Sequence, residues 1–279
     1  MFLNKKKMKT NILKVGAFAL FGLLALSSCK KEGCTDENAL NYNEEADKDD
    51  GTCEYAQSGK VTLKFDHRWG SSFNDFEMNK EYTHPGTQEK LTFQTLNYYI
   101  TNVKLKKSDG SWWSENESYH LVKVGDNSVP EIELKNVPNG GYTEIAYKIG
   151  VDSTRNVSGA QTGALDPAHG MFWNWNTGYI FVKAEGVSPD SSSGGFSYHL
   201  GGFQTPNNAI QNKTSAFGGS TLNVEGTIKE PQIHFYVNVA RFWHGGISVD
   251  DVTTVHMPGE NATLLATNFG DGFIVHHIH

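Results

Sequence analysis

Alternating apolar and polar positions restrict the fold of this chain more than any other feature of its sequence. In the segment that starts at Lys60, the apolar residues Val61, Leu63 and Phe65 stand at every second position, with polar residues between them. An alternation of period two places the apolar side chains on one face of a β-strand. Further strands are expected over residues 96–105, 119–124, 143–151, 179–184, 222–228, 232–240 and 272–279.

Turn-forming residues separate these segments. Ser108-Asp109-Gly110 and Pro138-Asn139-Gly140-Gly141 have the composition of tight turns, and the chain contains 29 glycines. No long amphipathic helix is predicted, although a short helix over 236–243 or 250–255 fits the pattern. The sequence therefore predicts an all-β fold, with an antiparallel β-sandwich or barrel-like domain and long loops over residues 58–279.

The N-terminal residues have the order of a bacterial signal peptide. Lysines at positions 5, 6, 7 and 9 precede an apolar run from Ala17 to Leu26, which is too short to span a bilayer comfortably. The run ends in Leu26-Ser27-Ser28-Cys29, which resembles a lipobox. We therefore expect residues 1–28 to be a lipoprotein signal peptide and Cys29 to carry the lipid. The expected location is the bacterial outer membrane, on its periplasmic or cell-surface face, with the membrane as a partner.

The charge of the mature chain argues against nucleic-acid binding. Five lysines and no acidic residue precede Cys29, so removal of the signal peptide changes the formal net charge from −7 to −12. A nucleic-acid-binding protein needs a basic face to contact phosphates. We therefore expect no nucleic-acid partner.

The segment from residue 29 to residue 57 has the composition of a small acidic module. With Cys29 lipidated, Cys34 and Cys53 remain as one pair, which we expect to form a disulfide in an oxidising compartment. The segment is too short to bury a core, so the disulfide would hold it together. A solvated spacer is the default interpretation. Calcium is a weaker alternative, because three aspartates could offer oxygen ligands, although not at EF-hand spacing: Asp47, Asp49 and Asp50.

Two tryptophans one residue apart mark the segment Met171-Phe172-Trp173-Asn174-Trp175. A tryptophan needs packing for its ring and a partner for its indole N–H, so a pair in a turn-rich segment indicates a built site as readily as core packing.

The chain has 11 histidines, and six of them follow residue 230. His67 falls on the apolar face of the first strand, as either a satisfied core histidine or a metal ligand. At the C-terminus, Phe273, Val275, His277 and His279 are expected to share one strand face, which makes the two histidines either joint ligands or a solvated end. No zinc-type spacing is present, and imidazole-only sites suit copper, zinc or nickel.

Three further histidines fall in segments suited to a metal site. His199 precedes Leu200-Gly201-Gly202, whose glycines allow other parts of the chain to approach closely. His234 lies in an alternating strand and projects away from its apolar face, and His120 is a weaker candidate. His84 and His256 are assigned to loops.

Hydrolase chemistry finds little support in the sequence. The chain has no Gly-x-Ser-x-Gly elbow, and no phosphate-binding loop follows a strand. Asp152, Asp166 and Glu185 are spread along the chain without a clear acid–base pair. We therefore expect a binding protein and not an enzyme.

Ordered sequence blocks from about Lys60 to His279 resemble the MbnP-like family, which is named for the partner protein encoded beside the genes of the copper chelator methanobactin. In chain order the blocks are residues 96–105, Gly141-Tyr142 with 147–151, Leu165-Asp166-Pro167 with 171–175 and Gly178-Tyr179, and finally Tyr198-His199-Leu200-Gly201-Gly202. The chain lacks the extra cysteines of the methanotroph proteins, and it ends in His276-His277-Ile278-His279.

This resemblance implies a secreted β-sandwich protein associated with copper. Related surface copper proteins use histidines and a tryptophan oxidised to kynurenine, and a dihaem peroxidase-like partner performs the oxidation. An electron-rich indole beside a copper site can be oxidised or can contact the metal. The tryptophans that the resemblance makes candidates for oxidation or for lining the site are, in order, Trp173, Trp175 and Trp69. The expected function is therefore copper capture or handling, with copper as the cofactor. The first-choice ligands are His67, His199, His277 and His279, with His234 and His120 in reserve.

The alternative function is glycan or protein binding by a surface lipoprotein that holds no metal. Exposed aromatic side chains would then form a stacking platform, and the histidines would be incidental. The residues that would build this platform are Trp112, Trp113, Trp173 and Trp175.

Overall fold

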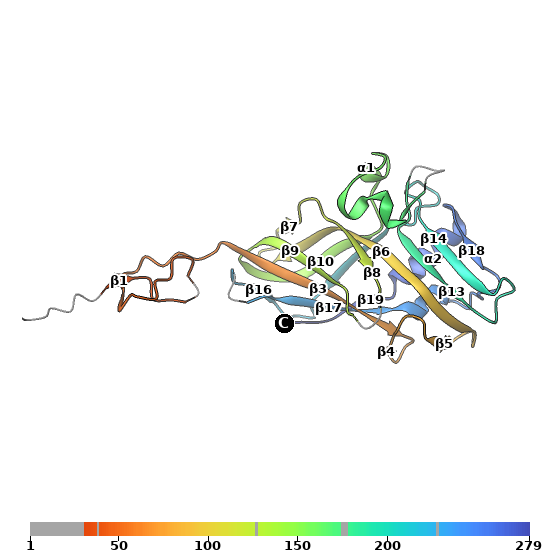
Figure 1. Cartoon of the computed structure of the whole chain (residues 1–279), viewed down its shortest axis with the longest axis horizontal. Helices are drawn as coiled ribbons and strands as arrows, with labels where there is room; N and C mark the ends of the chain where they lie inside the picture. The colour runs from red at the N-terminus through yellow and green to blue at the C-terminus, as the bar shows by residue number, and fades with distance from the viewer. Residues whose placement is uncertain (1–30, 38, 126–127, 174–177, 227–228) are drawn as a thin grey trace, which may run out of the picture. The chain divides into compact units, whose positions relative to one another are not determined.

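The computed structural model describes residues 31–37, 39–125, 128–173, 178–226 and 229–279. The chain divides into two compact units, one made of Met1–Glu37 and Asn41–Cys53 and the other of Asn38–Leu40 and Glu54–His279. We call the second unit the β domain (Figure 1). The domain limits expected after residues 28 and 57 stay predictions, and the expected lipidation site Cys29 lies outside the described residues.

The small unit contains two short parallel strands, β1 (Glu32–Gly33) and β2 (Lys48–Asp49). Its expected disulfide between Cys34 and Cys53 is confirmed, and Cys34 is buried. The carboxylates of Asp49 and Asp50 accept hydrogen bonds from the backbone N–H groups two residues on, at 3.0 and 2.9 Å. These bonds stabilise the turn before Cys53, and calcium binding there stays a prediction.

Strands make up most of the β domain, with a few short helices between them. The strands are β3 (Ser58–Trp69), β4 (Asn74–Asp75), β5 (Glu81–Thr83), β6 (Lys90–Lys107), β7 (Trp112–Ser114), β8 (Tyr119–Lys123), β9 (Glu131–Pro138), β10 (Gly140–Ile149), β11 (Phe172–Trp173), β12 (Gly178–Tyr179), β13 (Val182–Val187), β14 (Gly195–Leu200), β15 (Gln211–Ala216), β16 (Leu222–Val224), β17 (Gln232–Asn238), β18 (Thr254–Val255) and β19 (Phe273–Ile278). The helices are α1 (Ser153–Asn156), η1 (Gly163–Leu165), η2 (Pro167–His169), η3 (Val239–Trp243) and α2 (Glu260–Gly270).

Two sheets form the body of the β domain, which confirms the expected all-β fold. The larger sheet runs in the order β15-β10-β6-β13-β14-β18, with β16 on β10 and with β5, β7 and β8 on β6. This sheet curls into a half-barrel (Figure 1). The smaller sheet runs in the order β19-β17-β3-β4, with β9 on β3, and most of its pairs are antiparallel, although β17 and β3 are parallel. A separate short pair joins β11 to β12.

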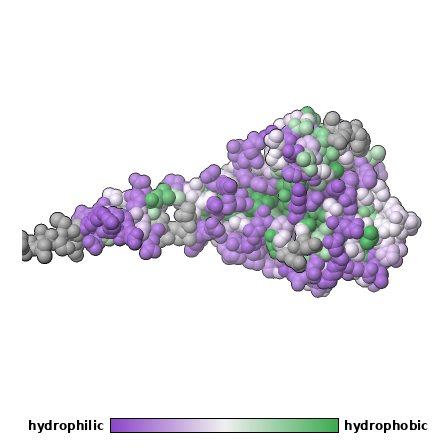
Figure 2. All heavy atoms as spheres, viewed as in Figure 1, coloured by the Kyte–Doolittle hydropathy of each residue, from purple (hydrophilic) through white to green (hydrophobic). Residues whose placement is uncertain are grey.

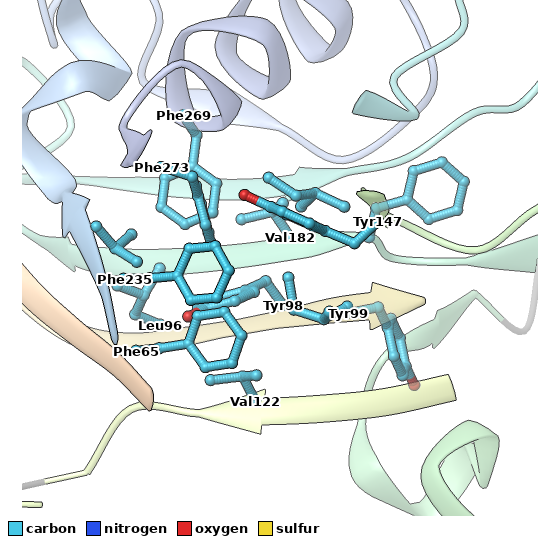
Figure 3. Packing of buried hydrophobic residues seen from close by; sticks show 14 of the residues in the cluster. Phe65, Leu96, Tyr98, Tyr99, Val122, Tyr147, Val182, Phe235, Phe269 and Phe273 are labelled. Atoms are coloured by element: carbon cyan, nitrogen blue, oxygen red, sulfur yellow. The ribbon is translucent and has the colours of Figure 1, made fainter. Parts of the chain in front are cut away.

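Aromatic rings from both sheets and from α2 fill the core. Phe65 of β3 stacks on Phe235 of β17 with ring centroids 5.1 Å apart. Phe269 of α2 and Phe273 of β19 pack edge to face on Tyr98 of the larger sheet (Figure 3). All five rings are at most 6% exposed, and burial of each contributes about 2–3 kcal/mol to folding. The alternation that begins at Val61 therefore marks the face of β3 that points into this core.

Outward positions of the strands carry the polar residues. The burial of β3 alternates without a break from Lys60 to Trp69, as the sequence pattern predicts. On the face of the β domain shown in Figure 2, hydrophilic residues predominate around smaller hydrophobic patches. None of the helices in the described part of the chain has the length and apolar composition required to cross a membrane.

Several elements differ from the sequence prediction. The helix α2 and the strands β9 and β15 were not expected. The strand expected over 222–228 is described as β16, which ends at Val224, and the strand expected over 232–240 ends at Asn238. A short 3-10 helix, η3, follows directly, inside the range where a short helix was expected.

Candidate metal centre

The histidines predicted as ligands do not form one site. The structure places them at four locations: His67 in the core, His120 on β8, His199 on β14, and His234 together with His277 and His279 on β17 and β19. Each location has its own chemistry, so the single ligand set drawn from the sequence divides into separate candidates.

His67 is a satisfied core histidine. Its side chain is 6% exposed, and its Nε2 atom forms a 3.1 Å hydrogen bond with the hydroxyl of Tyr98. Burial lowers the pKa of His67 to about 3, so the ring is neutral near pH 7. Among the described residues, no ring contact joins His67 to another histidine.

His120 pairs with a carboxylate and not with another histidine. Its Nε2 atom lies 2.7 Å from Oε2 of Glu115, which also accepts a 2.6 Å hydrogen bond from the hydroxyl of Ser118. Ser118 in turn accepts a hydrogen bond from the backbone N–H of Val103. The pair therefore ties the turn before β8 to β6, and it serves below as a natural control for histidine–carboxylate pairing.

His199 is the centre of a polar cluster on the outward face of β13 and β14. Its Nε2 atom lies 2.7 Å from Oε1 of Glu185, the residue on the neighbouring strand β13. The ring of His256 stacks on that of His199 with centroids 4.3 Å apart. His256 is itself held by a 2.7 Å hydrogen bond between its Nε2 atom and the hydroxyl of Ser197. We call His199 and His256 the strand histidine pair.

The electrostatics around His199 favour its neutral form. Burial is the main cause that lowers the pKa of His199, and the nearby His256 and Lys183 act in the same direction, whereas Glu185 raises it. The carboxyl pKa of Glu185 is in turn held low by His199 and by Lys183, against the opposing effect of burial. A charged carboxylate that accepts the Nε2–H of His199 leaves the Nδ1 lone pair of that ring free to bind a metal ion.

Trp173 packs beside the strand that carries this pair. Trp173 is 5% exposed, and two atoms of its ring lie only 2.7 and 2.8 Å from the position that a Cβ atom on Gly201 would occupy. Gly201 follows β14 directly, two residues after His199. The Trp173 ring therefore packs against the segment that directly follows β14. A glycine at 201 is what makes room for the ring.

A pocket opens next to Trp173. It has a volume of about 610 Å³, and its walls include Trp173, Tyr179, Phe203 and Pro258. Pro258 stands two residues after His256, so the same loop lines the pocket and carries one member of the strand histidine pair. Trp173 and Pro258 therefore line one pocket, and the loop of Pro258 also carries His256.

The other tryptophans are placed differently. Trp69 is buried under Tyr82 and donates its indole N–H to the carbonyl of Thr83 at 3.1 Å, so it is a packing residue. Trp175 lies outside the described residues. Trp112 is 41% exposed, and the neighbouring Trp113 packs partly against the core. Trp173 is buried, and the alternative of a glycan- or protein-binding platform stays a prediction.

His234, His277 and His279 form the second histidine cluster, which we call the terminal histidine cluster. Each offers one nitrogen atom, and these atoms all lie within 4.8 Å of one another, which makes this the one group of three or more His, Cys, Asp or Glu side chains with such spacing in the described residues. Burial and the neighbouring rings of His277 and His279 lower the pKa of His234 to about 4.

The expected face of the terminal strand was wrong. Phe273 is buried on the core side, whereas His277 and His279 are exposed, opposite to the shared face predicted from strict alternation. The cause is a β-bulge, because the register shifts between His234 and Phe235 and leaves His276 as an extra residue on β19. One extra residue moves every following side chain to the other face of the sheet.

His256 is the residue that sequence reasoning missed. It was assigned to a loop, and it does lie just after β18, which adds in parallel to β14. This pairing across 57 positions of sequence brings His256 to His199. The local sequence His256-Met257-Pro258 contains no spacing signal for it, so only the tertiary fold identifies the pair.

The comparison with family models confirms the resemblance to the MbnP-like family. A family model described as MbnP matches residues 58–258. Among solved structures, the chain is similar to MbnP from Methylosinus trichosporium, with 13% sequence identity, a TM-score of 0.46, and coverage of 74% of this chain and 84% of that one. No curated protein matches the chain.

Proposed function

The chain belongs to the MbnP family, and from that premise we propose that it binds copper through the strand histidine pair, His199 and His256, for copper capture or handling and not for catalysis. The observation that carries the proposal is the convergence of two motif blocks. The block with Trp173 and the block with His199 are separate in sequence, yet the Trp173 ring lies against Gly201 beside the strand of His199.

The donor set fits copper. Two imidazoles stacked at 4.3 Å supply nitrogen ligands that suit copper, and among divalent ions the Irving–Williams order places copper above zinc and nickel at such sites. Glu185 and Ser197 each hold one Nε2 atom, so they would orient the two rings and leave both Nδ1 atoms for the metal. Bound copper would supply a redox-active centre beside the indole of Trp173.

Location and partners complete the proposal. A lipid on Cys29 would anchor the protein in the bacterial outer membrane, and the acidic segment that follows would separate the β domain from the lipid surface. A dihaem peroxidase-like partner would oxidise a tryptophan, for which Trp173 is the first candidate because it lies beside the strand of His199. The pocket at Trp173 gives such a modification access to solvent.

A Cu(I) titration of the purified full chain against a competing chelator tests the proposal. We expect the protein to withdraw Cu(I) from the chelator, and the His120→Ala variant to do so equally, because His120 pairs with Glu115 but with no second imidazole. The same titration on protein from the native host tests whether Cu(I) binding depends on oxidation of Trp173. Mass spectrometry of the peptide that contains Trp173 shows whether the residue is oxidised. If neither preparation withdraws Cu(I), the protein does not handle copper.

A further inference from the structure

The terminal histidine cluster is built by two strands and is not a loose chain end. In the antiparallel pair of β17 and β19, His234 stands directly opposite His277. His279 is held opposite Gln232 by two backbone hydrogen bonds, of 2.6 and 3.1 Å. The bulge at His276 then turns the side chains of His277 and His279 to the outward face, which is the face that carries His234. Backbone pairing therefore fixes the backbone positions from which all three histidine side chains project.

The three rings form a compact group. The centroid of His234 lies 4.2 Å from that of His277 and 4.8 Å from that of His279, and the rings of His277 and His279 are 5.5 Å apart. Neutral imidazole is the form that binds metal ions.

Neighbouring side chains leave one nitrogen free on two of the rings. The Nε2 atom of His234 lies 3.1 Å from the amide oxygen of Gln232, which can only accept, so Nε2–H donates and Nδ1 keeps its lone pair. On His277, Nδ1 lies 2.7 Å from Nδ1 of His276, and in the tautomer in which His277 donates this bond, its Nε2 keeps a lone pair. The ring of His276 is held in turn by stacking on Tyr236 at 3.9 Å.

We propose that His234, His277 and His279 bind one divalent first-row transition metal ion at a site separate from the strand histidine pair. Metal–nitrogen bonds of about 2.0–2.1 Å require ligand atoms no more than about 4.2 Å apart. The present spacing of up to 4.8 Å therefore needs only small ring rotations, and these are available because His277 and His279 are exposed. Three imidazoles and no thiolate favour Cu(II), followed by Zn(II) or Ni(II).

This site does not follow from family membership. The family match ends at residue 258, so it includes His234 but neither His277 nor His279. The two candidate sites also lie on different sheets, since His199 belongs to the larger sheet and His234 to the smaller one. The inference therefore stands or falls independently of the proposed function.

Cu(II) titration of the full chain, followed by electron paramagnetic resonance, tests the site. We expect a spectrum with three coupled imidazole nitrogens, and single replacements His234→Ala, His277→Ala and His279→Ala should each lower the Cu(II) affinity at least tenfold and remove one nitrogen. His244→Ala, at another exposed histidine, should change neither. Because the replaced side chains are exposed or half-buried, circular dichroism should remain that of the wild type.

Two outcomes would overturn the inference. If His234→Ala binds Cu(II) as the wild type does, the chain end chelates alone and no site is built between the strands. If the signal persists in His234→Ala/His277→Ala/His279→Ala but is lost in His199→Ala/His256→Ala, the ion belongs to the strand histidine pair. Persistence of the three-nitrogen signal in His199→Ala/His256→Ala would support the terminal site even if the proposed copper function fails.

Discussion

Replacement of His199 and His256 together by alanine should weaken Cu(I) binding by at least about 1000-fold. Loss of a single side chain that only orients a ligand typically costs 10- to 100-fold in metal affinity, so loss of both ligands should exceed that range. A 1000-fold loss corresponds to about 4 kcal/mol of binding free energy. The measurement is a chelator competition in a His234→Ala/His277→Ala/His279→Ala background, so that the terminal histidine cluster does not contribute.

Two further variants separate ligand loss from general damage. Glu185→Gln keeps the shape of the side chain but removes the charge that accepts the hydrogen bond of His199, so the affinity should fall by only about 10- to 100-fold. His120→Ala removes the similar pair with Glu115 and should leave Cu(I) affinity unchanged. Affinity of the double variant within threefold of the background protein would refute the assignment of the ligands.

The stability of the wild-type protein should fall with acidification through His67, and His67→Gln should reduce this dependence. Burial holds the pKa of His67 at about 3, against 6.5 in the unfolded chain. Between these values the unfolded state binds a proton that the folded state excludes. The contribution of His67 to the free energy of unfolding is therefore fully present above pH 6.5 and is lost as the pH falls toward 3. Between pH 7 and pH 5, the loss amounts to about 2 kcal/mol.

Urea unfolding of both proteins at pH 7 and pH 5 measures this difference. Glutamine retains a partner for the hydroxyl of Tyr98, so the variant should fold with the same core. The loss of stability between the two pH values should be about 2 kcal/mol smaller in His67→Gln, whereas an exposed histidine replaced in the same way, His169→Gln, should behave as the wild type. Equal losses in all three proteins would mean that His67 titrates normally in the folded state.

The sequence predicted strands where alternation is regular and failed where it is interrupted. In β3 the apolar face runs from Val61 to Phe65 without a break, and His67 was correctly placed on it. The strand β6 was expected to begin at residue 96 but begins at Lys90, because an irregularity opposite Glu185 and Gly186 shifts the alternation. A bulge shifts the alternation of apolar and polar residues by one position, so a prediction that assumes strict alternation ends the strand at the bulge.

The helix α2 was missed for a related reason. Its N-cap is Gly259, which makes no side-chain capping hydrogen bond, and the helix contains threonines and asparagines of low intrinsic helix propensity. Burial of residues such as Leu265 and Phe269 against the core stabilises it instead. Tertiary packing of this kind has no local signature in the sequence.

The candidate sites were predictable only in part. His199 was identified from its local setting, and His277 and His279 as neighbours on one strand, but their further partners come from elsewhere in the chain. His256 reaches His199 through the pairing of β18 with β14, and His234 meets His277 only in the register of β17 with β19. These pairings depend on strand order, which the alternation of side chains does not encode.

The most direct test of the copper site is anomalous diffraction at the copper edge from crystals of the full chain loaded with Cu(I). We expect an anomalous peak within bonding distance of a ring nitrogen of His199 and a ring nitrogen of His256. A fully loaded crystal with no peak at these residues would contradict it, whether or not copper is found at the terminal histidine cluster.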